Sequence, residues 1–240
     1  MIPLRDRNPT RRTPVVTIGL IAACFVVFGI ELSVSASGGE PALGAFLERW
    51  GAVPRAISAS MTAGDWTSQA MLGVLGSVFL HGGWLHILGN MLYLWIFGNN
   101  IEDRLGRLPF LAFYLAGGVV AVFAQVWTNP TSGVPLVGAS GAIAATLGAY
   151  LVVFPGARIL SLVFLGFFYQ LLEVPAVILL GFWFVLQLVD GFGSLGATTT
   201  SGGVAFFAHI GGFVLGMLVG FAVRMMPGQP GRPSSPAWAG

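Results

Sequence analysis

The chain consists of long apolar runs separated by short polar links. The runs are apolar on all sides, whereas a transmembrane strand would alternate apolar and polar residues, so helices are the prediction. A helix needs roughly 20 apolar residues to cross a bilayer core of ~30 Å. Six runs fit this requirement if the shortest is surrounded by protein. We predict helices over residues 15–32, 79–97, 109–127, 140–154, 174–189 and 204–223.

The composition places these helices in a membrane. Hydrophobic residues make up 55% of the 240 residues, charged residues make up only 8%, and the mean hydropathy is +0.84. About a quarter of the residues of a soluble domain are charged, so too few charges remain here to cover a globule. The predicted class is an all-α, multi-pass integral membrane protein in a lipid bilayer. The net charge of +2 is too small to indicate a nucleic-acid partner, and Cys24 is the single cysteine, which excludes an intrachain disulfide.

The remaining segments predict a simple domain layout. Residues 1–14 should be a disordered basic leader, residues 15–223 the membrane domain, and residues 224–240 a disordered tail. A cleaved signal peptide begins similarly, but the first run is long and lacks a small-residue cleavage site directly after it, so we expect a retained helix. Residues 33–75 are predicted to be a long loop packed at the membrane interface. Residues 159–173 fit either a hairpin or a helix lying in the interface.

The positions of the arginines predict the orientation of the helices. With the amino terminus in the cytoplasm, nine of the eleven basic residues lie on the cytoplasmic side, and only Arg49 and Arg55 lie outside. Basic residues concentrate in cytoplasmic loops. Both termini are therefore predicted to be cytoplasmic, which requires an even number of helices. The inner arginines are Arg5, Arg7, Arg11, Arg12, Arg104, Arg107, Arg158, Arg224 and Arg232.

Four polar residues within the apolar runs share one predicted depth. In this topology the second, fourth and sixth helices all run from outside to inside. His86 and Asn90 lie in the first half of the second helix, and Ser140 opens the fourth. His209 lies about 9 Å into the sixth helix at 1.5 Å per residue. All four would lie in the outer half of the membrane, an agreement that scattered polar residues would rarely show.

Small residues predict which faces of these helices meet. His86 and Asn90 are four positions apart and therefore share a face. Small residues at every third or fourth position let membrane helices approach closely, so the fourth and sixth helices should bring the His209 imidazole beside the Ser140 hydroxyl. These small residues are Gly212, Gly216 and Gly220 after His209, and Ala144 and Gly148 after Ser140.

A serine beside a histidine can act as a nucleophile, because the histidine takes the hydroxyl proton. We therefore predict Ser140 as the nucleophile and His209 as the general base. Glu173 and Asp190 lie in or beside loops, so no carboxylate is placed to complete a triad and the prediction is a Ser–His dyad. Taken alone, Ser140 fits an ordinary helix cap, since serine is a favoured N-cap residue.

The same region offers donors for the oxyanion that forms when a serine attacks a carbonyl. Backbone N–H groups at the start of a helix are unpaired and point toward such a charge. The Asn90 amide and a His86 ring N–H can supply further donors. Gly138 and Gly141 lie next to the serine segment and allow the backbone to approach a substrate closely.

These motifs, taken in order, resemble the rhomboid family of intramembrane serine proteases, and the resemblance covers about residues 46–223. The matching motifs are His81-x4-His86-x3-Asn90, Glu102-x-Arg104, Gly138-Ala139-Ser140-Gly141, and Ala208-His209-x2-Gly212-x3-Gly216.

The resemblance implies a six-transmembrane-helix bundle with a water-filled cavity open to the outside. It implies Ser140 as nucleophile, His209 as base, and His86, Asn90 and the Ser140 N–H as oxyanion donors. It also implies single-pass membrane proteins as substrates, cut in or near their transmembrane segment, with no metal or cofactor. The family's fifth helix and the loop after it act as gate and cap, and the glycine-rich link 190–203 suits a mobile lid.

Two features depart from the family's pattern. Many members have an aromatic residue four positions after the serine, stacked on the histidine, and here Ala144 stands there. Many also have Trp-Arg eight or nine positions before the first motif histidine, where this chain has Leu72 and Gly73. Neither departure removes a catalytic group. Both leave open how the His209 ring is held and how the first loop is anchored.

Other functions fit the polar cluster less well. A transporter would carry an inverted repeat and polar groups along a route across the membrane. A metal site of His81, His86 and His209 would lack an accompanying carboxylate or H-E-x-x-H helix. An inactive rhomboid-like protein that binds membrane helices as a chaperone or adaptor usually lacks the serine or the histidine. His81 lies on a different face from His86 and is interpreted as structural, and Glu102 and Arg104 as bracing a loop. The compact form indicates a bacterial inner membrane.

Overall fold

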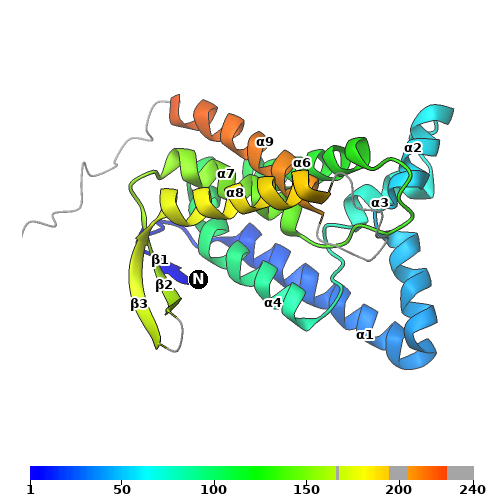
Figure 1. The fold of residues 1–240 in the computed structure, drawn as a ribbon, viewed down its shortest axis with the longest axis horizontal. Helices are drawn as coiled ribbons and strands as arrows, with labels where there is room; N and C mark the ends of the chain where they lie inside the picture. The colour runs from blue at the N-terminus through cyan, green and yellow to red at the C-terminus, as the bar shows by residue number, and fades with distance from the viewer. Residues whose placement is uncertain (166–167, 195–204, 226–240) are drawn as a thin grey trace, which may run out of the picture.

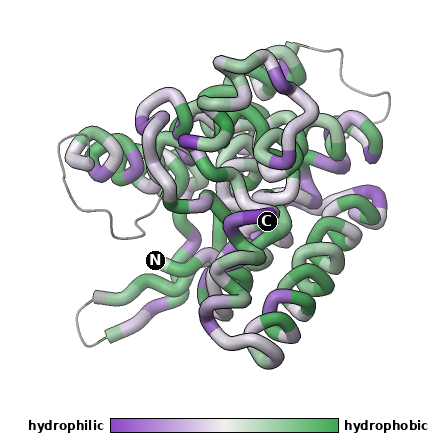
Figure 2. The backbone as a smooth tube through the Cα atoms, turned by 90° about the vertical axis from the view of Figure 1, so that its right-hand side faces the viewer, coloured by the Kyte–Doolittle hydropathy of each residue, from purple (hydrophilic) through white to green (hydrophobic). Residues whose placement is uncertain are grey.

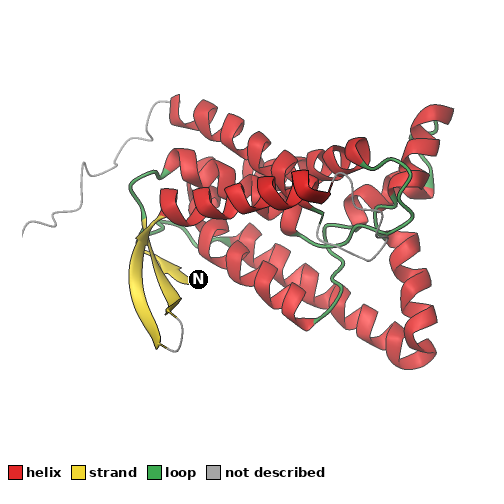
Figure 3. Cartoon of the chain, viewed as in Figure 1, coloured by secondary structure: helices red, strands yellow, loops and turns green. Residues whose placement is uncertain are grey.

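The structure is a computed structural model of the chain and describes residues 1–165, 168–194 and 205–225. It is a bundle of helices with a small three-stranded sheet at one end (Figures 1 and 3). The elements in chain order are β1 (Ile2–Asp6), α1 (Val15–Trp50), α2 (Pro54–Ala63), α3 (Gln69–Gly76), α4 (Trp84–Tyr93), the π-helix η1 (Leu94–Gly98), α5 (Asn99–Leu105), α6 (Arg107–Thr128), α7 (Ser140–Val153), β2 (Arg158–Leu165), β3 (Phe168–Pro175), α8 (Ala176–Ser194) and α9 (Phe206–Met225).

Four of the described helices, α1, α6, α8 and α9, are long and apolar enough to cross a membrane. Helix α7 is a shorter apolar helix of 14 residues, and eleven of these are buried. Burial in protein is the environment that a short membrane helix requires. Hydrophobic residues also predominate along the helices in Figure 2. The protein is therefore a mostly helical, multi-pass integral membrane protein.

The third, fourth, fifth and sixth predicted helices correspond to α6, α7, α8 and α9, although α8 runs on to Ser194. The helix predicted over residues 79–97 begins later, at Trp84, because the chain first turns through Gly83, which has a φ of 151°. It then continues through η1 and α5 to Gly106, where a φ of 89° ends it. The remainder of the predicted lid, residues 195–203, the first residue of the predicted sixth helix, and the tail from residue 226 lie outside the described residues.

The prediction of a long loop over residues 33–75 was wrong. Helix α1 continues through this segment to Trp50, with a kink at Gly39, and α2 and α3 follow. The segment folds because α3 packs on the end of α1. A Cβ at Gly73 would collide with the backbone carbonyl of Gly51, and a Cβ at Gly76 would lie 2.5 Å from the carbonyl oxygen of Trp50. Gly73, which stands where many family members have a larger residue, thus lets α3 contact the backbone at the end of α1 directly.

The prediction of a disordered leader over residues 1–14, and with it an all-α fold, was also wrong. Strand β1 pairs antiparallel with β2, which pairs antiparallel with β3. Of the two alternatives for residues 159–173, the hairpin is therefore confirmed. Asp6 at the end of β1 is buried and accepts hydrogen bonds from Asn100 Nδ2 at 2.6 Å and from the Tyr150 hydroxyl at 2.9 Å. These long-range hydrogen bonds hold the leader against α5 and α7.

The predicted packing of the fourth and sixth helices on small residues is confirmed. A Cβ added at Gly212 or Gly216 would collide with the backbone carbonyl of Gly141 or Ala145, respectively. A Cβ at Gly148 would collide with the carbonyl of Phe213 in the other direction. Helices α7 and α9 therefore touch backbone to backbone, a distance that only glycine allows at these positions.

Candidate active site

Ser140 and His209 meet where α7 begins. His209 Nε2 lies 2.8 Å from Ser140 Oγ, although 69 positions separate the two residues. The contact of Gly212 with Gly141 lies one turn from His209 and one residue from Ser140, so the close helix packing sets this distance. Ser140 makes no cap bond to its own helix, whose N-cap position is Ala139. The hydroxyl is thus hydrogen-bonded to the imidazole and does not cap its own helix.

Two residues of α8 that the sequence analysis missed also hold the His209 ring. Gln187 Oε1 lies 2.7 Å from His209 Nδ1, and the Trp183 ring lies 5.8 Å from the imidazole, tilted by 38°. Trp183 supplies an aromatic contact from α8, whereas Ala144, at the position where the family often has its aromatic residue, is fully buried. A polar amide in the middle of an apolar run was the available signal for Gln187, because polar groups inside membrane helices are rare and usually functional.

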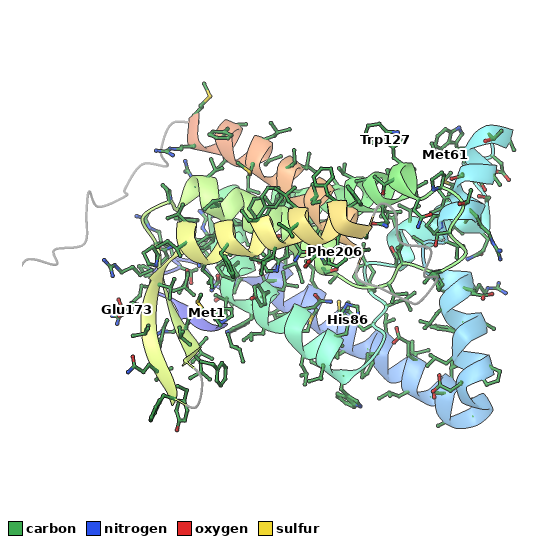
Figure 4. All side chains as sticks on the ribbon, in the orientation of Figure 1. Met1, Met61, His86, Trp127, Glu173 and Phe206 are labelled. Atoms are coloured by element: carbon green, nitrogen blue, oxygen red, sulfur yellow. The ribbon has the colours of Figure 1, made fainter. Side chains whose placement is uncertain are left out.

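The side chains of His86 and Asn90 converge on Gly138, two residues before Ser140. A Cβ at Gly138 would lie 2.7 Å from His86 Nε2 and 3.5 Å from Asn90 Nδ2, and its φ of 124° also requires glycine. His86, labelled in Figure 4, accepts a hydrogen bond from the Gly82 N–H at Nδ1, 3.3 Å away. The proton of the neutral ring is therefore on Nε2, the nitrogen nearest Gly138.

Asn90 is buried, and its Nδ2 has no hydrogen-bond partner among the described residues. A buried amide donor left unpaired costs free energy, so its retention here calls for an explanation. Together with His86 Nε2–H it provides two donors beside the backbone that leads into Ser140. The positions predicted for the oxyanion donors therefore cluster as expected, while their catalytic role stays a prediction.

A pocket of about 30 Å³ opens beside the serine. This volume holds a few water molecules at most. Its lining residues include Ser77, Val78, Gly118, Gly138, Ser140, Gly141, Ala205 and Ala208. The pocket therefore lies directly beside Ser140 and is lined by residues of α6 and α7 and by Gly138, two residues before Ser140.

The other motif residues stabilise the surrounding helices. The His81 backbone N–H donates to the buried Glu31 carboxylate at 3.0 Å, and its ring lies edge-to-face with His86 at 5.3 Å, in keeping with a structural role. Glu102 accepts from the N–H groups of Val16 and Thr17 at the start of α1. These are support contacts and bring no further charge to Ser140.

Arg104 has the corresponding role at the end of α9. Its Nη2 donates to the carbonyl of Val223 at 3.1 Å. Glu102 and Arg104 were predicted to brace a loop, but both lie in helix α5 and instead support the ends of α1 and α9. Within the part of the chain that the structure describes, no group of three or more His, Cys, Asp or Glu side chains could hold a metal ion.

Comparison with known proteins identifies relatives. The chain is 29% identical over 156 residues, 63% of its length, to Rhomboid protein 1, mitochondrial, of Saccharomyces cerevisiae. It is 36% identical over 123 residues, 51% of its length, to Rhomboid protease GluP of Bacillus subtilis. It is 37% identical over 97 residues, 40% of its length, to the human presenilin-associated rhomboid-like protein, mitochondrial. The aligned parts cover 42%, 23% and 25% of these relatives, less than half of each.

A sequence model of the Rhomboid domain matches residues 68–226. That range contains α3 to α9 and every motif residue discussed above, from His81 to Gly216. Because the match covers more than half of the chain, the chain belongs to the rhomboid family.

Proposed function

We propose that the protein is an intramembrane serine endopeptidase that cleaves single-pass membrane proteins in or near their transmembrane segment. The observation that carries the proposal is the 2.8 Å contact between Ser140 Oγ and His209 Nε2. Family membership supports it, since one relative is itself named a rhomboid protease. The alternative within the family is a catalytically silent protein that binds membrane helices as a chaperone or adaptor.

In the proposed mechanism His209 Nε2 takes the hydroxyl proton as Ser140 Oγ attacks the carbonyl carbon of the substrate. Negative charge develops on the carbonyl oxygen and is stabilised by His86 Nε2–H, the Asn90 amide and the Ser140 N–H. The imidazolium gives its proton to the leaving amine, which departs with one half of the substrate. A water molecule then attacks the acyl-enzyme by the same proton transfers and frees Ser140.

We also propose six membrane crossings, in which α7 and the continuous segment α4–η1–α5 join the four long helices. Both termini would be cytoplasmic, an orientation supported by the distribution of arginines. The Ser140 site then lies in the outer half of the membrane. The relatives include mitochondrial proteins and one from a bacterium, so the bacterial inner membrane stays a prediction.

The test is labelling of the purified protein in detergent with a fluorophosphonate, which reacts with activated serines. Wild type should be labelled, and Ser140→Ala and His209→Ala should not, while both variants keep the helical circular dichroism spectrum of the wild type. Cleavage of a tagged single-pass membrane protein in liposomes should follow the same order. Absence of labelling and cleavage in correctly folded wild type would favour the chaperone or adaptor function.

A further inference from the structure

The base of the proposed dyad is held from a helix that the dyad itself does not use. Gln187 and Trp183 are one turn apart on the same face of α8, and both contact the His209 ring. The amide oxygen of Gln187 accepts a hydrogen bond from the Nδ1–H of His209, with 2.7 Å between the two atoms. His209 Nε2 is therefore unprotonated and free to accept the Ser140 hydroxyl proton, which is the tautomer that a general base requires.

Helix α8 is also at the periphery of the bundle. Of its 19 residues only Ala176, Leu179, Leu180 and Gly191 are buried. Its other side exposes large apolar residues, among them Phe182, Val185 and Val189. A displacement of α8 would break both contacts to His209 and leave the packing of α7 on α9 intact.

We propose that Gln187 and Trp183 are positioning residues, so that His209 is set as a base only while α8 is packed against α9. This inference rests on the proposed protease function. The orientation of the His209 ring therefore depends on contacts from α8 as well as on the packing of α7 against α9. Gln187 carries no charge, so it orients the ring without adding a carboxylate to the Ser–His dyad.

The experiment measures the rate of fluorophosphonate labelling as a function of probe concentration. Gln187→Ala should lower the maximal rate roughly tenfold, the worth of one neutral hydrogen bond, and leave the half-saturating concentration unchanged. Gln187→Glu keeps an acceptor oxygen at the same reach and should restore most of the rate. Leu186→Ala, an exposed neighbour on the same helix, is the matched control and should label like wild type.

The outcomes separate this proposal from the proposed function. If Gln187→Ala labels at the wild-type rate, or if Leu186→Ala slows equally, the positioning role is wrong although the protein is a serine hydrolase. If wild type itself labels no faster than Ser140→Ala, the protease proposal fails instead.

A second inference concerns the hairpin and does not depend on catalysis. The outer half of β2 and β3 exposes large apolar side chains that are 41% to 76% accessible, a high value for a sheet in water. Two of them are phenylalanines and one is a tyrosine; tyrosine is enriched at the membrane interface, and phenylalanine and leucine are typical of the apolar face of segments that lie in it. The exposed residues are Phe164, Phe168, Tyr169, Leu171 and Leu172.

The position of the hairpin indicates what covers these side chains. It connects α7 to α8, and Pro175 at the end of β3 is followed directly by the first residue of α8. The exposed apolar surface continues from the hairpin onto α8 through Val177 and Ile178. Figures 1 and 3 show the strands at the end of the bundle, running across the direction of the helices and projecting beyond them. Figure 4 labels Met1 and Glu173 at the same end.

We infer that the hairpin lies in the lipid interface of the membrane leaflet at that end and anchors the sheet to lipid. The exposed side chains of Phe164, Phe168 and Tyr169 would enter the boundary between headgroups and acyl chains. Arg5 and Arg158, both exposed near the base of the sheet, would lie among the headgroups.

Site-directed spin labelling tests the inference, because Cys24 is the only cysteine and one replacement, Cys24→Ala, gives a cysteine-free background. In liposomes, a nitroxide at Phe168→Cys should collide more often with oxygen than with a water-soluble nickel chelate. A nitroxide at Asp65→Cys, on the exposed turn between α2 and α3, should show the reverse. Ready access of nickel to position 168 would mean that the hairpin is in water. Access by neither reagent would mean that a protein surface covers it. Either result overturns the lipid contact.

Discussion

Replacing Gly216 with alanine should separate α7 from α9 and disconnect Ser140 from His209. The added Cβ would lie 2.7 Å from the carbonyl carbon and 2.9 Å from the Cα of Ala145. Carbon atoms pack best at about 3.5–4.0 Å, so the helices must move apart by about 1 Å. A shift of that size would stretch the 2.8 Å contact between Oγ and Nε2 beyond hydrogen-bond range.

Gly216→Ala should lower both the free energy of unfolding and the rate at which Ser140 is labelled. Overpacking of this kind destabilises by about 1–3 kcal/mol. A misplacement of about 1 Å between reacting groups lowers the rate roughly 10²-fold. The maximal rate of fluorophosphonate labelling measures the second effect, and thermal unfolding in detergent measures the first.

Two matched glycine changes calibrate the result. At Gly220 the nearest contacts of an added Cβ are at 3.0 Å, so Gly220→Ala should need a shift of only a few tenths of an ångström and keep most of the labelling rate. At Gly19 on α1 nothing lies within 4 Å, so Gly19→Ala should label like wild type. Wild-type labelling by a folded Gly216→Ala variant would refute the argument that close helix packing sets the dyad.

Three further results are expected. Asn90→Ala should lower cleavage by about 10²–10³-fold with the helical content unchanged, as for the loss of one oxyanion donor, and a change below tenfold would contradict that role. Glu102→Ala leaves the N–H groups of Val16 and Thr17 unpaired and should lower stability by about 1–2 kcal/mol, seen as a lower midpoint of thermal unfolding. Burial raises the pKa of the Asp6 carboxyl above its ordinary value of 3.8, although the hydrogen bond from Tyr150 opposes the shift. The folded state therefore favours protonated Asp6, so the stability that Asp6 contributes is complete below pH 3.8 and is lost as pH rises through the raised pKa. Asp6→Asn should remove this decline, and an unchanged pH profile of unfolding would show that Asp6 does not cause it.

The site was predictable from sequence where the chemistry lies within short motifs on one helix face. The contact of Ser140 with His209 could be predicted because α7, of 14 residues, and α9, of 20 residues, each carry a stripe of small residues on one face. Two helices with such stripes can pack closely in only a few ways. Gln187 was not predicted, because it comes from a third helix whose rotation relative to α9 is set by tertiary contacts. A single amide in an apolar run does not allow its hydrogen-bond partner to be predicted from the sequence.

The fold was least predictable where tertiary contacts override local pattern. Residues 33–75 lack a clear apolar period, and their helices pack through the backbone of glycines such as Gly73. The leader looks disordered by composition, yet β1 is ordered because a strand far along the chain pairs with it. Pairing partners at such a sequence distance leave no trace in the local composition of either segment.

That pairing also sets an order of events during synthesis. Ile2 pairs with Leu162, and Asp6 with Ile159, so β1 has no partner until the chain has been made through β2. At about 5–20 residues per second, roughly 8–32 seconds pass between the two strands leaving the ribosome. During this interval β1 has no partner strand, while α1 to α7 are synthesised. The sheet can therefore close only after α1 to α7 have been synthesised, and closing it ties the first residues of the chain to the segment that leads into α8.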